Sequence, residues 1–67
     1  MDLDPGDFVI AARELGDAGT GFVNRGTDGI VARRGGDTYT VVFTSPGFLA
    51  DTTTTLTGLT TADLVKR

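Results

Sequence analysis

The sequence lacks several residue types on which whole classes of protein chemistry depend. Its 67 residues include no cysteine, no histidine and no tryptophan. Without thiols the chain can form neither a disulfide nor a thiolate metal site, and nothing in it indicates an oxidising compartment. Without imidazole it can form no Ser-His-Asp triad and no histidine-ligated zinc site. We therefore expect a protein that is not an enzyme and that holds no cofactor or metal.

Long apolar runs are also absent. No segment approaches the roughly 20 apolar residues of a membrane-spanning helix, and the opening MDLDPGD is acidic where a signal peptide would be basic and then apolar. We expect a cytoplasmic protein with one domain over residues 1–67. In a domain of this size, apolar burial barely offsets a folding entropy of roughly 1.5 kcal/mol per residue, so a partner or self-association could add stability.

The charge balance is acidic, with a formal net charge of −3. Proteins that bind nucleic acid usually present a basic field, because neutralising phosphates supplies most of their affinity. Four basic residues could still form a small patch: Arg33, Arg34, Lys66 and Arg67. A nucleic-acid-binding small barrel that uses this patch is therefore an alternative function, and a small-ligand carrier is a weaker one.

The segment from Arg25 to Phe43 predicts a β-hairpin at the centre of the fold. It is rich in β-branched and aromatic residues, and Gly35-Gly36 can supply the positive φ values of a two-residue turn. In the second strand Tyr39, Val41 and Phe43 alternate with mostly polar residues, which predicts that these three side chains share a core-facing surface. In the first strand we expect Val31 to point inward and Ile30 to be partly covered.

The rest of the chain predicts further short strands separated by turns. We expect a turn at 4–7, a strand in 7–13 that is apolar on both faces, and a Gly-rich loop over 14–29 in which Phe22 and Val23 tuck back. A turn at 45–47, a Thr-rich strand over 52–56, a single helical turn within 59–64 and a last strand at 64–67 complete the chain. These elements predict an all-β fold, a small closed or half-open five-stranded barrel.

Two groups of carboxylates could in principle carry chemistry. Glu14 and Asp17 could act as an acid–base pair, but both lie in a Gly-rich loop where nothing would desolvate them. Asp2, Asp4 and Asp7 lack the spacing of a dedicated calcium loop. Turn formation and solvation account for these acids more simply than catalysis or metal binding does.

An apolar trio, Phe48-Leu49-Ala50, follows the Pro46-Gly47 turn and raises a different question. These residues could fold back over the end of the barrel as a lid, or they could stay exposed as a docking surface. Phe22 in the first loop poses the same choice. If both segments point outward with Arg25 at the rim, the candidate protein-binding residues are Phe22, Arg25, Phe48 and Leu49.

The order of several short motifs resembles a known group of proteins. The motifs are Pro5-Gly6-Asp7 before Val9, the segment 25–31 with the pattern Arg-Gly-Thr-x-Gly-x-Val, the segment 39–43 with the pattern Tyr-Thr-Val-x-Phe, and Asp63-Leu64. Together they resemble the SH3-like barrels of the electron-transport accessory group, which includes the nitrile hydratase beta subunit, an accessory protein of photosystem I and the ferredoxin–thioredoxin reductase variable chain. They are also similar to related short bacterial SH3-like proteins.

The resemblance implies a five-stranded SH3-like barrel with a long first loop and a one-turn 3-10 helix before the last strand. It also implies a non-enzymatic accessory module that docks on a larger protein, often one encoded nearby, and stabilises or modulates it. The chain departs from the nitrile hydratase beta subunit because it has no tryptophan and a shorter segment between Arg25 and Tyr39. The resemblance therefore implies the fold rather than a particular metal-enzyme partner.

Overall fold

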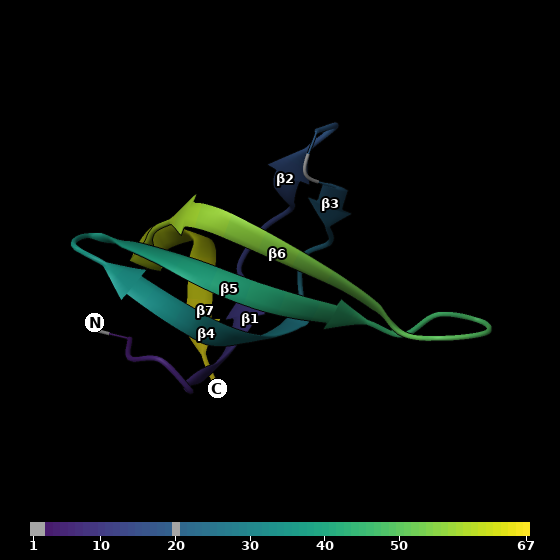
Figure 1. Cartoon of the computed structure of the whole chain (residues 1–67), viewed down its shortest axis with the longest axis horizontal. Helices are drawn as coiled ribbons and strands as arrows, with labels where there is room; N and C mark the ends of the chain where they lie inside the picture. The colour runs from purple at the N-terminus through teal and green to yellow at the C-terminus, as the bar shows by residue number, and fades with distance from the viewer. Residues whose placement is uncertain (1–2, 20) are drawn as a thin grey trace.

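A computed structural model describes residues 3–19 and 21–67 as an all-β protein (Figure 1). Its strands are β1 (Phe8–Ala11), β2 (Leu15–Asp17), β3 (Gly21–Val23), β4 (Asp28–Gly35), β5 (Thr38–Ser45), β6 (Thr52–Leu59) and β7 (Leu64–Lys66). A 3-10 helix, η1 (Thr61–Asp63), lies between β6 and β7. The prediction of an all-β fold with one helical turn before the last strand is confirmed.

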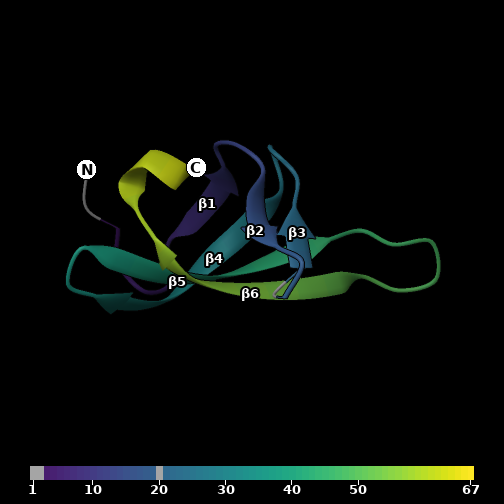
Figure 2. The ribbon, with the colours of Figure 1, turned by 90° about the horizontal axis from the view of Figure 1, so that it is seen from above.

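Five of the strands form one antiparallel sheet in the order β6-β5-β4-β1-β7, and β2 and β3 form a separate two-stranded ribbon. The order leaves β6 and β7 as the two edges of the larger sheet, so among the described residues no sheet closes into a barrel. The ribbon lies beside β6 (Figure 2), where a Cβ added to Gly21 would lie 3.6 Å from a methyl group of Thr54. The sheet is thus open, with the ribbon next to one of its edges.

The central hairpin forms as predicted, but its turn is displaced by one residue. Gly35 pairs with Thr38, so the two turn residues are Gly36 and Asp37 rather than Gly35 and Gly36. Gly36 has a φ of +61°, whereas Asp37 has a negative φ. A glycine with positive φ at the first turn position followed by a residue with negative φ is the pattern of a type II′ turn, which suits the twist of a hairpin.

The Gly-rich segment that the sequence predicts to be a loop contains the β2–β3 ribbon. In the register of this ribbon Leu15 pairs with Val23 and Gly16 pairs with Phe22. Val23 is buried, as expected, but Phe22 has 61% of its surface exposed. The prediction that Phe22 tucks back is therefore wrong, because alternation along a strand sends the two neighbouring side chains to opposite faces.

Strand β6 is longer than predicted because a bulge keeps its second half in the sheet. Leu56 pairs with Val41 and Leu59 pairs with Tyr39, so one extra residue of β6 lies between the two pairs. Gly58, with a φ of +71°, lies within this irregularity. A common type of β-bulge contains a glycine with positive φ, and it shifts the pairing of the strand by one residue. As a result Leu56 and Leu59, three positions apart, are both buried.

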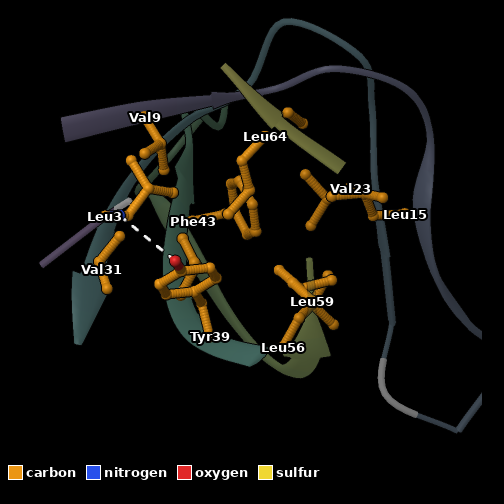
Figure 3. Packing of buried hydrophobic residues seen from close by; sticks show 12 residues of the cluster. Leu3, Val9, Leu15, Val23, Val31, Tyr39, Phe43, Leu56, Leu59 and Leu64 are labelled. Carbon is orange, nitrogen blue, oxygen red and sulfur yellow. Dashed lines mark hydrogen bonds between the residues drawn. The ribbon is translucent and has the colours of Figure 1, made fainter. Parts of the chain in front are cut away.

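The hydrophobic core lies on one side of the large sheet and is shown in Figure 3. The predicted inward face of β5 is confirmed, since Tyr39, Val41 and Phe43 are all buried. Leu3 reaches the same core from the N-terminal segment, and its backbone N–H donates a 3.3 Å hydrogen bond to the Tyr39 hydroxyl. The core residues are Leu3, Val9, Ala11, Leu15, Val23, Val31, Tyr39, Val41, Phe43, Leu56, Leu59 and Leu64.

Candidate functional site

The segment 46–51 between β5 and β6, named here the projecting loop, carries the most exposed apolar side chains of the described chain. Phe48 is fully exposed and Leu49 is 93% exposed. In Figures 1 and 2 this loop extends past the sheet at one end of the long axis of the molecule. Of the two alternatives that the sequence left open, the lid over the barrel end is wrong, and the outward-facing arrangement is the one observed.

The shape of the projecting loop is set by a close approach of its own backbone. A Cβ placed on Gly47 would lie 2.1 Å from the Ala50 carbonyl oxygen, far inside any permitted contact. Only glycine therefore fits at position 47 in this conformation. The close approach of residues 47 and 50 turns the chain sharply, and Phe48 and Leu49 occupy the turn between them. The two apolar side chains are presented on a bend rather than along an extended strand.

The other two candidate binding residues lie elsewhere on the surface. Arg25 is exposed in the turn at 24–27, where the Thr27 N–H donates to the Asn24 carbonyl at 3.2 Å. Arg25 and Pro46 both line a shallow hollow of about 400 Å³ between this turn and the end of β5. Phe22, Phe48 and Leu49 do not line it. The structure thus brings Arg25 to the base of the projecting loop, but it does not gather all four predicted residues around one hollow.

A second exposed apolar surface was not selected from the sequence. It lies on the face of the large sheet opposite the core, and we name it the outer sheet face. Its most exposed members are Phe8 at 61%, Val65 at 51% and Ile30 at 42%, and Ile10 and Val42 are partly exposed beside them. The available signal was the strand FVIAA at 8–12, which is apolar on both faces.

The proposed basic patch is largely paired with acids. Arg34 lies 3.6 Å from an Asp4 carboxylate oxygen, and Lys66 lies 3.7 Å from an Asp7 carboxylate oxygen. Arg67 forms a 2.6 Å ion pair with Asp28. Because three of the four basic side chains have a carboxylate partner, they do not present the unopposed positive field on which phosphate binding depends.

Asp63 is the only charged residue buried among the described residues, with 7% of its surface exposed. Its Oδ2 accepts a 3.0 Å hydrogen bond from the Thr60 N–H, and its Oδ1 accepts bonds from Nε and from a terminal guanidinium nitrogen of Arg13. Burial works to raise the pKa of Asp63, but the bonds from Thr60 and Arg13 outweigh it and hold the pKa below its usual range. Both oxygens are engaged, so this carboxylate holds η1 in place rather than offering a free base.

Two other carboxylates serve local turns. Asp7 accepts a 2.9 Å hydrogen bond from the Asp4 N–H, and Asp17 accepts a 2.8 Å bond from the Gly19 N–H. Glu14 and Asp17 are exposed, and Asp2 lies outside the described residues. In the described part of the chain no three acidic side chains gather in a way that could hold a metal ion.

No protein-family model, no curated protein and no solved structure matches the chain. Over residues 3–19 and 21–67 the structure has no helix with the length and apolar character needed to span a membrane. The exposed surfaces described above are therefore the features that indicate a function for this chain.

Proposed function

We propose that this chain is a non-enzymatic protein-binding module that docks on a larger partner through its projecting loop. One observation carries the proposal: Phe48 and Leu49, adjacent in sequence, have almost all of their surface exposed. Burying one such side chain is worth about 1.5–3 kcal/mol, so leaving two of them in water is unfavourable unless a partner covers them. Anchors of this kind, inserted into a pocket of a partner, often supply most of the energy of an interface.

The charge of the projecting loop favours a protein partner over a lipid surface. The loop contains no lysine or arginine, and its only charged residue is Asp51. Loops and helices that bind anionic membranes combine apolar residues with basic ones, because the bilayer surface is negative. A preformed apolar pocket on a protein matches Phe48 and Leu49 without that requirement.

We propose further that the fold is an open form of the SH3-like barrel. Three features support this assignment. The strand order is β6-β5-β4-β1-β7, the long connection between β1 and β4 carries a two-stranded ribbon, and a 3-10 helix separates β6 from β7. The ribbon and the N-terminal segment cover the core where a closed sheet would. In this arrangement the projecting loop is the longer of the two hairpin loops of the large sheet, the other being the Gly36-Asp37 turn between β4 and β5.

The proposal is tested by site-specific photo-cross-linking and affinity capture in the organism that makes the protein. A photoreactive amino acid at position 48 is expected to yield one dominant cross-linked partner. With that partner purified, Phe48→Ser and Leu49→Ser are each expected to weaken binding at least tenfold, about 1.4 kcal/mol. Ala50→Ser, which changes an exposed residue of the same loop, is the matched control and is expected to bind as the wild type does. Equal binding by all of the folded variants would reject this surface.

Phe22→Ser and Arg25→Ala extend the same assay to the rest of the predicted site. Arg25 lies at the base of the projecting loop, so its removal is expected to weaken binding less than loss of Phe48 does, as is usual for a charge at the rim of an interface. Phe22 lies on the β2–β3 ribbon, outside the hollow that Arg25 lines. Unchanged binding by Phe22→Ser would restrict the interface to the projecting loop and its base.

A further inference from the structure

The outer sheet face forms a continuous apolar surface across four strands. Phe8 of β1 pairs with Ile30 of β4, and Ile30 pairs with Val42 of β5, so these three side chains form one row across the sheet. Ile10 of β1 pairs with Val65 of β7 and extends the surface toward the other edge. Contiguous apolar patches of this kind are uncommon on monomeric proteins and usually mark an interaction surface.

An ion pair crosses this surface. Arg67 follows β7 and Asp28 begins β4, and the strand order places β1 between them. Their 2.6 Å contact therefore spans β1, and both side chains are more than half exposed. A shallow apolar hollow beside the pair is lined by Phe8, Ile30, Val42 and the two charged residues, among others. The two charges of this pair cancel each other, although the chain carries a net charge of −3.

We infer that a second copy of this chain covers the outer sheet face, and that the two sheets pack face to face about a two-fold axis. In a two-fold dimer both copies contribute the same surface patch to the interface, so that patch has to be complementary to itself. The apolar row formed by Phe8, Ile30 and Val42 satisfies this condition. So does the Arg67–Asp28 pair, because the Arg67 guanidinium of one copy can approach the Asp28 carboxylate of the other without net repulsion.

A dimer interface of standard size needs only a small part of the surface of this chain. Interfaces at the lower end of the standard range bury about 600 Å² per partner. That is about one seventh of the 4388 Å² of accessible surface of the described chain. Face-to-face packing of two β-sheets, with side chains of both interdigitating, is a common architecture and needs no new backbone hydrogen bonds. The arrangement also supplies the additional buried area that a domain of 67 residues has difficulty providing alone.

The inference does not depend on the proposed function, because it involves a different surface. The projecting loop belongs to the β5–β6 connection, whereas Phe8, Ile30 and Val65 lie on β1, β4 and β7. A dimer built through the outer sheet face leaves both projecting loops exposed. It would thus present two copies of the proposed docking site.

Sedimentation equilibrium of the purified chain from about 10 μM to 1 mM tests the inference. The wild type is expected to shift from a mass of 7.0 kDa toward twice that value as its concentration rises. Phe8→Ser and, separately, Val65→Ser are expected to raise the dissociation constant at least tenfold while keeping a wild-type circular dichroism spectrum. Both side chains are largely exposed in the single chain, so both variants are expected to fold. Phe48→Ser is the control and is expected to dimerise as the wild type does.

Exchanging the charges of Asp28 and Arg67 provides an independent test of the dimer. Asp28→Arg places two positive charges on each copy of the face and is expected to weaken dimerisation at least tenfold. Combining it with Arg67→Asp restores neutrality and is expected to bring dimerisation back to within a few-fold of the wild type. A mass of 7.0 kDa at every concentration would overturn the inference. So would a dimer that persists in folded Phe8→Ser and Val65→Ser or that Phe48→Ser disrupts.

Discussion

Arg13 and Asp63 are fifty positions apart in sequence, yet the Arg13 guanidinium donates two hydrogen bonds to one oxygen of the buried Asp63 carboxylate. Arg13 lies in the connection that leaves β1, and Asp63 ends the 3-10 helix η1. The Ala12 N–H also donates to the Asp63 carbonyl at 2.9 Å. These contacts fix the turn from which β7 starts, and they make the stability of the fold depend on the charge of one aspartate.

Acidification is expected to weaken the protein through Asp63. The pKa of this carboxyl is lowered in the folded chain, so its contribution to stability is present above the ordinary aspartate pKa of about 3.9 and is lost as the pH falls through the folded value. Asp63→Asn should cost about 1–3 kcal/mol at pH 7, because the buried bonds to the charge are weakened. Urea unfolding followed by circular dichroism should show this difference at pH 7, and the difference should shrink as the pH falls through the lowered pKa of the folded carboxyl.

Arg13→Ala should have a milder effect than Asp63→Asn. The Arg13 side chain is 70% exposed, so its ion pair is screened by water and is worth about 1 kcal/mol or less. The bonds from Thr60 to Asp63 also remain when Arg13 is removed. A loss equal to that of Asp63→Asn in the same urea titrations would contradict this division of roles.

Gly29 is expected to be required for full stability, because side chains of β5 leave no room for a Cβ at this position. A Cβ at position 29 would lie 2.8 Å from the Phe43 ring and 2.8 Å from a Val41 methyl group. Gly29→Ala should therefore lower the free energy of unfolding by about 1–3 kcal/mol, the usual cost of an overpacked core. Gly35→Ala is the matched control, since Gly35 is in the same strand and has no atom within 4 Å of the added Cβ. Thermal unfolding of the control should match the wild type or exceed it slightly.

Patterns with period two were the part of the fold that could be predicted from sequence. Tyr39, Val41 and Phe43 alternate with mostly polar residues, and such a pattern encodes only which face of the strand points into the core. The same rule placed Val31 inward. The β2–β3 ribbon was missed because each of its strands has three residues and includes a glycine, which is also the composition of a loop. The bulge at Gly58 was missed because two leucines three positions apart do not look like one face of a strand.

The candidate site shows where sequence reasoning stops. An apolar segment such as Phe48-Leu49 has the same composition whether it covers a core or points into water, and only the path of the chain decides between the two. The outer sheet face was harder still to foresee. A strand whose two faces are both apolar, such as β1, favours burial of both faces. In the structure Val9 is buried, but Phe8 on the other face is 61% exposed. What the second face packs against is not encoded in the strand itself.

Tyr39→Phe is expected to loosen the N-terminal segment. The Tyr39 hydroxyl accepts a hydrogen bond from the buried Leu3 N–H, and its removal leaves that donor without this partner at a cost of about 1–3 kcal/mol. Amide hydrogen exchange should show faster exchange at Leu3. The Asp7 amide, which donates to the Asp4 carbonyl at 3.0 Å, should keep its wild-type rate and serve as an internal control. Unchanged exchange at Leu3 would show that the hydroxyl does not hold this segment.

Phe43 and Phe48 allow a core side chain to be compared with an exposed side chain of the projecting loop. Phe43 has no exposed surface and Phe48 is fully exposed. Phe43→Ala should cost about 3–5 kcal/mol, because it removes a buried ring and leaves a cavity. Phe48→Ala should change the free energy of unfolding by no more than about 0.5 kcal/mol, since no described residue packs against its fully exposed side chain. Urea unfolding of both variants, measured at one low protein concentration so that association does not contribute, checks the contrast. A loss above about 1 kcal/mol for Phe48→Ala would mean that its side chain folds onto the sheet in solution, and the docking site proposed above would then lose its main anchor.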